Sequence, residues 1–222
     1  MHSQELSVIQ ELILKDKINL QDIVRSFITS VKTSQINAWE TIIRSSDVEI
    51  SPNKTTALFG LLVGVKDNIA TKDFPTSMGV DFWPGSAPGF DARVVHNLRM
   101  AGATIVGKTK CSEYAVHEPT DTINPRYPDC EPGTSSSGSA AAVANGDVPV
   151  ALGTQTAGSI AKPASYCGVI GFKPSFGELP RTGVLKTTEL FDTVGMFGNS
   201  IKSIEQTYKA VSYTHLTLPT KA

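Results

Sequence analysis

The chain has 222 residues, of which 40% are hydrophobic, and this is enough for one sizeable globular domain or two small ones. Its formal charge is −1, from 20 basic and 21 acidic residues, so it lacks the basic field typical of nucleic-acid-binding proteins. The three cysteines have no zinc-site spacing, Glu5 interrupts any signal peptide, and no apolar run reaches the ~18 residues of a membrane helix. We therefore expect a cytoplasmic protein without metal, nucleic-acid or membrane partners.

The predicted elements alternate between helices and apolar strands. The two N-terminal helices are amphipathic, and Asn19 with Asp22 is expected to cap the second. The strands are apolar along most of their length, which is typical of a sheet covered on both faces. This pattern predicts an α/β layered domain with helices at 4–15, 20–33, 91–101, 137–145 and 199–210, and strands at about 59–66, 103–108, 148–153 and 169–173.

Residues 133–146, "GTSSSGSAAAVANG", place hydroxyl side chains directly before an Ala-rich helix. A phosphate-binding loop would need a lysine, which this segment lacks. A flexible linker is a second alternative, but the segment runs straight into the helix. At a helix N-terminus, free N–H groups and the helix dipole favour developing negative charge. The segment therefore indicates a loop that positions a catalytic hydroxyl.

A hydroxyl nucleophile needs a base, and the four histidines do not supply one in a recognisable pattern. No GxSxG motif is present, so a Ser/His/Asp triad is poorly supported. Lys66, in "GVKDN", ends an apolar strand, where burial can lower its pKa from about 10.4 to about 7–8. Asp67 is expected to point to the opposite face of the strand. The alternative for Lys66 is a solvated strand end.

A second Gly/Ser element, "ALGTQTAGSIAKPASYCGVIGFKPS" (151–175), follows a strand and ends its turn at Ser159. The small residues allow a sharp turn that exposes several N–H groups. Together with "GVKDN" and residues 133–146, this element resembles the amidase signature family, serine hydrolases with a Ser/cis-Ser/Lys triad that act on linear amides. The resemblance covers about residues 1–211.

The resemblance implies the N-terminal part of a fold with a mixed β-sheet covered by helices on both faces. It assigns the base to Lys66, the cis-serine to Ser135 and the nucleophile to Ser159. It also implies an oxyanion hole and substrate-binding surface, formed by Thr156, Ala157, Gly158, Ser136 and Lys162 with the N–H group of Ser159. In such a relay, Ser135 takes the proton of Ser159 and neutral Lys66 takes the proton of Ser135.

The sequence departs from the family at several positions. Thr134 stands where a second glycine is usual, and Lys162 stands where arginine is usual, which weakens any preference for acidic substrates. Cys167 is interpreted as a packing residue. We divide the chain into a partial amidase signature domain (1–211) and an unrelated tail (212–222), as a read-through artefact would produce.

These features predict an amidase that hydrolyses a carbon–nitrogen bond of a small linear amide through an acyl-enzyme, without a cofactor. The segment "GTQTAGS" favours a stand-alone enzyme. One alternative is the catalytic subunit of a glutamine-dependent tRNA amidotransferase, and another is an inactive fragment. Assembly into a homo-oligomer is compatible with the sequence.

Overall fold

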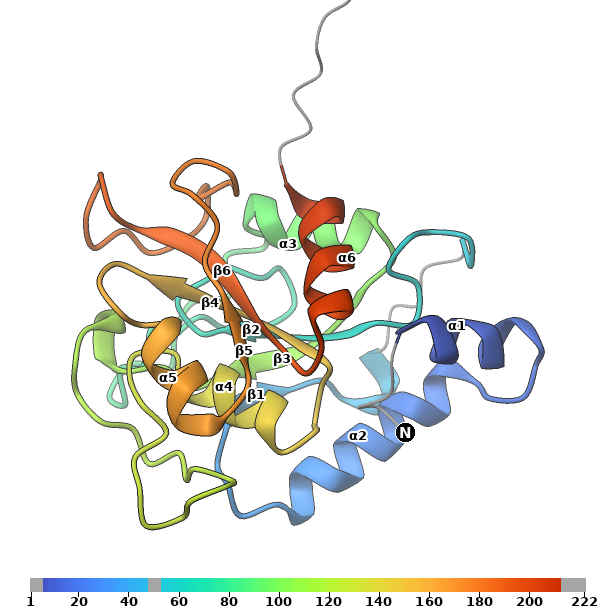
Figure 1. Cartoon of the computed structure of the whole chain (residues 1–222), viewed down its shortest axis with the longest axis horizontal. Helices are drawn as coiled ribbons and strands as arrows, with labels where there is room; N and C mark the ends of the chain where they lie inside the picture. The colour runs from blue at the N-terminus through green and yellow to red at the C-terminus, as the bar shows by residue number, and fades with distance from the viewer. Residues whose placement is uncertain (1–5, 48–52, 213–222) are drawn as a thin grey trace, which may run out of the picture.

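The computed structural model describes residues 6–47 and 53–212, and its centre is a six-stranded mixed sheet (Figure 1). The strand order is β1-β3-β2-β4-β6-β5. Strand β2 lies between β3 and β4 and is parallel to both, whereas the remaining neighbours are antiparallel. The strands are β1 (Trp39–Ile42), β2 (Leu62–Lys66), β3 (Thr104–Thr109), β4 (Val150–Gln155), β5 (Ile170–Phe172) and β6 (Thr193–Gly198).

Helices cover the sheet on both sides. Helices α3 and α6 pack together against β3 and β6, and α4 and α5 pack together against the central strands and β5. Every residue of β2, β3 and β4 is buried, as predicted for strands covered on both faces, and so is every residue of β6. The prediction is wrong for β5, where Ile170 and Gly171 are exposed at the sheet edge. The helices are α1 (Leu6–Leu14), α2 (Leu20–Thr33), α3 (Arg93–Met100), α4 (Ser137–Ala144), α5 (Ala161–Cys167) and α6 (Ile201–Val211).

The Ala-rich sequence of helix α4 allows the helix to pack closely against its neighbours. All its residues but the last are buried, and it lies so close to neighbouring backbone that larger side chains would collide. A Cβ atom added at Gly138 would lie 2.3 Å from the carbonyl oxygen of Ala38 and 2.4 Å from the backbone nitrogen of Lys110. The small residues therefore let α4 approach the sheet and hold the loop before it near the strand ends.

The expected α/β class, mixed sheet and double helical covering are confirmed, but several elements differ from the sequence predictions. Strand β2 begins at Leu62 rather than 59, because Gly60 has a φ of +86° and the chain turns there. The predictions omit β1, β6 and α5. Strand β1 has only four residues, and α5 lies in a segment whose small residues predict a turn. Residues 4–5 and 213–222 lie outside the described residues.

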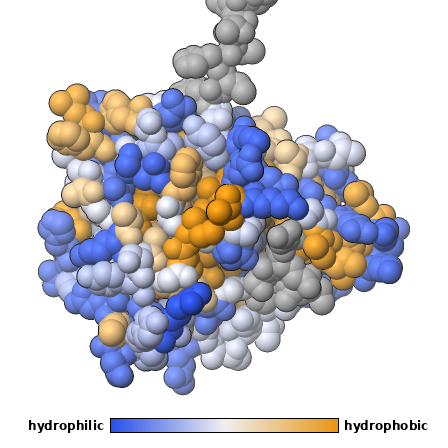
Figure 2. Space-filling view, viewed as in Figure 1, coloured by the Kyte–Doolittle hydropathy of each residue, from blue (hydrophilic) through white to orange (hydrophobic). Residues whose placement is uncertain are grey.

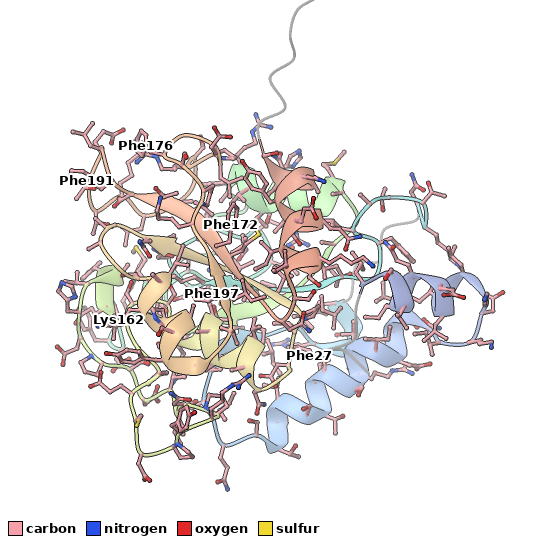
Figure 3. The ribbon with its side chains drawn as sticks, viewed as in Figure 1. Phe27, Lys162, Phe172, Phe176, Phe191 and Phe197 are labelled. Atoms are coloured by element: carbon pink, nitrogen blue, oxygen red, sulfur yellow. The ribbon has the colours of Figure 1, made fainter. Side chains whose placement is uncertain are left out.

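Exposed apolar side chains lie on the edge strand β5 and on the loop between β5 and β6. Figure 2 shows apolar side chains near the centre of this face and at its upper left, and Figure 3 places Phe176 and Phe191 in that upper left region. Both side chains are about half exposed or more, as is Leu190, and Ile170 is exposed on β5 itself.

In the described part of the chain, no helix is long and apolar enough to span a bilayer.

Candidate active site

Lys66 ends β2 inside the protein and is fully buried. Its Nζ atom donates hydrogen bonds to Oγ of Ser135 at 2.8 Å and to Oγ1 of Thr154 at 2.9 Å. Asn68 also donates to Oγ1 of Thr154, at 2.9 Å. The alternative interpretation of Lys66 as a solvated strand end is therefore wrong. Its amine is buried and contacts a cluster of hydroxyl groups.

Burial lowers the pKa of Lys66 to about 8, against its ordinary value of 10.5. The carboxylate of Asp192 acts in the opposite direction, because a nearby negative charge favours the protonated amine. Asp67 does not pair with Lys66. Its carboxylate instead accepts hydrogen bonds from Ser77 and lies 3.1 Å from Nζ of Lys108. The lysine at the end of β2 is thus an amine that can lose its proton near neutral pH.

Ser135 lies in the loop before α4, and its peptide bond with Thr134 is cis. The carbonyl oxygen of Ser135 accepts a hydrogen bond from the backbone N–H of Ser112 at 3.1 Å. Its side chain is 1% exposed, so its hydroxyl faces the protein interior and the amine of Lys66. The sequence resemblance assigns a cis-serine to this position, and the backbone has that geometry here.

Ser159 lies in the turn between β4 and α5, and the side chain of Gln155 fixes that turn. Oε1 of Gln155 accepts hydrogen bonds from the backbone N–H groups of Ile160 at 2.8 Å and Ala161 at 2.9 Å. The backbone N–H groups of residues 156–159 have no hydrogen-bond acceptor among the described residues. They are thus available for a group that approaches the turn.

The Ser135 loop packs against both ends of this turn. Before the turn, Oγ of Ser136 donates to the carbonyl oxygen of Thr154 at 3.2 Å. After the turn, Gly133 lies so close to Pro163 that an added Cβ would be 2.8 Å from its Cα. The two Gly/Ser segments of the sequence therefore lie side by side. Ser159 is partly exposed, and its hydroxyl has no hydrogen bond to any described residue.

The two remaining candidates have different surroundings. The hydroxyl of Ser136 is buried and committed to the carbonyl of Thr154. Lys162 is exposed on α5 (Figure 3), and its backbone N–H donates to the carbonyl oxygen of Gly158 at 2.8 Å. Cys167 packs inside, with Sγ 3.4 Å from the carbonyl oxygen of Pro132, and burial raises its pKa to about 12.

Sequence reasoning missed three polar residues beside the site. Thr154 and Asn68 connect to Lys66 by hydrogen bonds, and Lys108 forms a buried ion pair with Asp67. The signal for Thr154 was present, because it lies inside "GTQTAGS", and Asn68 ends "GVKDN". Lys108 had no such signal, because a lysine late in an apolar strand is also typical of a solvated end.

A model of the family described as Amidase matches residues 13–221. A mitochondrial glutamyl-tRNA(Gln) amidotransferase subunit from Ajellomyces capsulatus is 38% identical over 207 residues, 89% of this chain and 39% of that protein. The corresponding subunit from Methanosarcina mazei is 36% identical over 92% of this chain and 45% of that protein. The chain thus spans less than half the length of these curated relatives, and their names favour the amidotransferase alternative.

Solved structures give the same family. A glutamyl-tRNA(Gln) amidotransferase subunit from Thermotoga maritima has a TM-score of 0.84 and 28% identity, covering 95% of this chain and 47% of that one. The peptide amidase from Stenotrophomonas maltophilia has a TM-score of 0.80 and 27% identity, covering 99% of this chain and 51% of that one. The fold described above is therefore shared with both an amidotransferase subunit and an amidase.

Proposed function

The chain belongs to the amidase family, and we propose that it carries the machinery for hydrolysis of a primary amide, with Ser159 as nucleophile, Ser135 as proton relay and Lys66 as base. The observation that carries this proposal is the 2.8 Å contact between Lys66 and Ser135, beside a turn with free N–H groups. A buried amine with a lowered pKa can act as a base near neutral pH.

The proposed reaction proceeds through an acyl-enzyme. Oγ of Ser159 forms a bond to the amide carbon while its proton passes to Ser135, whose own proton passes to the lone pair of Lys66. The negative charge on the carbonyl oxygen is stabilised by the N–H groups of the turn at 156–159. The proton returns along the same relay to the leaving nitrogen as the C–N bond breaks. Water then cleaves the ester by the same steps and releases the carboxylate.

We propose glutamine as the amide donor, with the released ammonia passed to a glutamyl-tRNA within an amidotransferase. The support is the similarity to curated amidotransferase subunits, at 36–38% identity over about nine tenths of this chain. This assignment brings protein partners, since those relatives are named as subunits. It replaces the stand-alone enzyme as the first candidate.

A stand-alone amidase is the second candidate, supported by the likeness to a peptide amidase over 99% of the chain. Ammonia release distinguishes the two. We would incubate the purified protein with L-glutamine and with simple primary amides, and Ser159→Ala would provide the background. The amidotransferase assignment expects preference for glutamine and a rate that rises when the other subunits are added. Equal or faster turnover of simple amides by the protein alone would contradict it and support the second candidate.

Ammonia release that is unchanged in Ser159→Ala would overturn the mechanism itself. The parent protein and this variant differ by one oxygen on a partly exposed side chain without hydrogen bonds to described residues, so both should fold equally well. Ser165→Ala is the matched control, because Ser165 is an exposed serine on the next helix, α5.

A further inference from the structure

A small pocket lies next to the proposed active site. Thr154 and Thr156 form its inner wall, and the first of these is the hydroxyl partner of Lys66. The outer wall is the loop between β5 and β6, including Arg181 and Lys186. This loop is fastened to the site, because the backbone N–H of Leu185 donates to the carbonyl oxygen of Asn68 at 2.9 Å.

Arg181 has an unused donor in this wall. Its Nη1 atom is buried and has no hydrogen-bond partner among the described residues, although buried guanidinium donors are usually paired. The guanidinium carbon lies 4.6 Å from the centre of the Phe176 ring, which holds the group in place. Arg181 is thus a positioned cation with spare donor capacity at the pocket.

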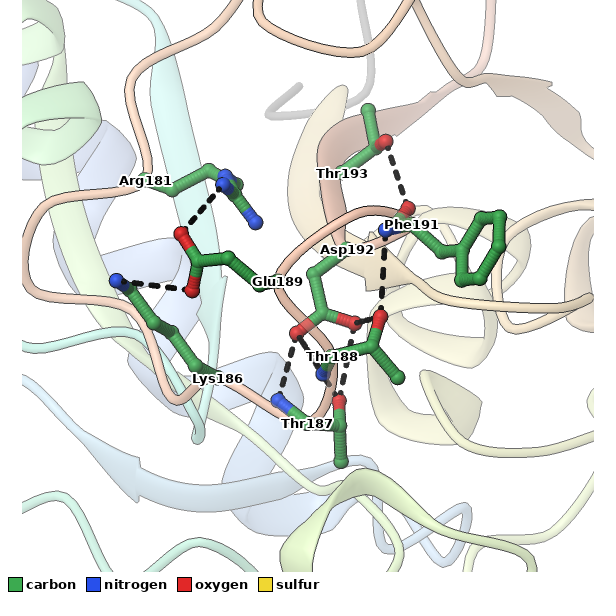
Figure 4. A network of polar contacts seen from close by, with 8 residues as sticks. All are labelled: Arg181, Lys186, Thr187, Thr188, Glu189, Phe191, Asp192 and Thr193. Atoms are coloured by element: carbon green, nitrogen blue, oxygen red, sulfur yellow. Dashed lines mark hydrogen bonds and ion pairs between the residues drawn. The ribbon is translucent and has the colours of Figure 1, made fainter.

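Arg181 and Lys186 share one carboxylate, that of Glu189 (Figure 4). The contacts are long, 3.4 Å from Nη2 of Arg181 and 3.3 Å from Nζ of Lys186. The Glu189 side chain is 66% exposed, and exposed ion pairs of this kind contribute little stability. A carboxylate with better geometry could therefore replace Glu189 at small cost.

Asp192 is the acidic residue that lines this pocket, and its carboxylate already accepts several hydrogen bonds. Its carboxylate accepts hydrogen bonds from the backbone N–H groups of Thr187 and Thr188 (Figure 4). It also accepts one from Oγ1 of Thr156. Burial acts to raise the pKa of Asp192, but these hydrogen bonds hold it below its ordinary value. Asp192 therefore anchors the loop to the turn that carries Ser159. Because its carboxylate is occupied, Arg181 and Lys186 remain available to bind another anion.

We propose that this pocket is a carboxylate subsite, in which Arg181 and Lys186 bind the acid group of a substrate that is both an amide and a carboxylic acid. Glu189 competes with that acid group for the same two cations. The inference rests on the proposed function, because it assigns the amide end of the substrate to the neighbouring site at Lys66 and Ser135. Lys162 does not line this pocket, so the selection of acidic substrates is assigned to Arg181 instead.

The test is a binding measurement that needs no turnover. In the Ser159→Ala protein, calorimetric titration would compare three monoamides of dicarboxylic acids, malonamate, succinamate and glutaramate, with the corresponding neutral diamides. We expect at least one monoamide to bind about tenfold more tightly than its diamide, because its carboxylate accepts charge-assisted hydrogen bonds that the neutral diamide cannot accept as strongly. The preference should weaken as sodium chloride is added.

Three substitutions give opposite expectations that a purely structural role would not produce. Glu189→Gln should tighten monoamide binding, whereas Lys186→Gln and Arg181→Gln should weaken it, the latter by about tenfold. Glu189 and Lys186 are exposed, so these two variants should fold even if loss of the contact between Arg181 and Phe176 unfolds the third. Arg25→Gln, an exposed arginine on α2, is the matched control and should change nothing.

Equal affinity for monoamides and diamides would overturn the subsite, and so would binding that neither Glu189→Gln nor Lys186→Gln alters. These outcomes are separate from failure of the proposed function. Charge-dependent binding with the expected variant pattern supports the subsite even if Ser159 proves not to be the nucleophile. Conversely, ammonia release that depends on Ser159 without any preference for an acid group would contradict the subsite alone.

Discussion

Nζ of Lys66 lies 2.8 Å from Oγ of Ser135, although 69 residues separate them in the chain. The parallel pairing of β2 with β4 brings the end of β2 beside Thr154, and α4 packs against the same strands and holds the Ser135 loop there. The contact therefore depends on the central three strands and α4.

The first prediction concerns the nucleophile. A fluorophosphonate probe should phosphonylate the protein once, at Oγ of Ser159 with loss of fluoride, because that hydroxyl lies on a turn with unused N–H groups. Ser159→Ala should abolish the mass increase in intact-protein mass spectrometry, while Ser165→Ala should label normally. Full labelling of Ser159→Ala would place the reactive hydroxyl elsewhere.

The second prediction concerns the pH dependence of that reaction. Neutral Lys66 is the form that accepts a proton, so the labelling rate should rise with pH and level off above about 8, the lowered pKa of this amine. Lys66→Ala should reduce the rate by at least about a hundredfold and remove the pH dependence. The rate constants would be measured by stopped reactions at a series of pH values on both sides of that pKa. A variant with near-normal rates would rule out the relay.

The third prediction is that Lys66 destabilises the fold at neutral pH. Between about pH 8 and pH 10.5, Lys66 is protonated in the unfolded chain and neutral in the folded protein. The contribution of Lys66 to the free energy of unfolding therefore rises with pH in this range. The penalty is fully present below pH 8 and amounts to about 3 kcal/mol. Lys66→Met removes it but leaves the hydroxyls of Ser135 and Thr154 without their amine partner, which offsets part of the gain.

We therefore expect Lys66→Met to raise the melting temperature by a few degrees at pH 7 and to lose this advantage near pH 10.5. Differential scanning calorimetry of both proteins at each pH would measure it. Lys209→Met, at an exposed position on α6, should show no pH-dependent difference of this size. The difference in melting temperature between Lys66→Met and the parent would be compared at the two pH values. If this difference favoured the variant more at pH 10.5 than at pH 7, the sign of the argument would be wrong.

The fourth prediction concerns the ion pair between Asp67 and Lys108, whose side chains are 1% and 0% exposed. Lys108→Met should lower the free energy of unfolding by about 3–5 kcal/mol, because it leaves a carboxylate buried without a counter-charge. The double variant with Asp67→Asn should recover part of that loss. Urea unfolding would measure both. Lys110→Met, which breaks the ion pair with the exposed carboxylate of Asp121, should cost less than about 1 kcal/mol. Equal losses in the two single variants would refute the burial argument.

The fifth prediction concerns self-association. Strand β5 is an edge strand, and exposed apolar residues lie on it and on the loop that follows it, so the chain should self-associate at micromolar concentrations. Ile170→Lys and Leu190→Lys should shift the chain toward the monomer in sedimentation velocity. Met100→Lys, an exposed apolar position on α3, is the control. A parent chain that sediments as a monomer at all concentrations would be evidence against this surface as an interface.

The sequence by itself determined the class of fold and the residue types of the candidate site. Apolar strands between amphipathic helices predicted the α/β layers, because strands that are buried on both faces consist mainly of apolar residues. The two Gly/Ser segments and "GVKDN" indicated sharp, hydroxyl-bearing turns and a lysine at a strand end, and their resemblance to the amidase signature family assigned the roles of Lys66, Ser135 and Ser159.

Tertiary structure alone decided which of these groups meet and which charges are buried. Strand β6 and the short β1 became strands through pairing with β4 and β3, which are remote in sequence, and no local periodicity encodes such pairing. Lys66 and Lys108 both end apolar runs, yet one lies beside hydroxyl groups and the other beside a carboxylate. Arg181 appeared in no motif. Its place at the pocket follows from the loop that Asn68 and Asp192 hold against the strand ends, where contacts between distant segments set both position and charge.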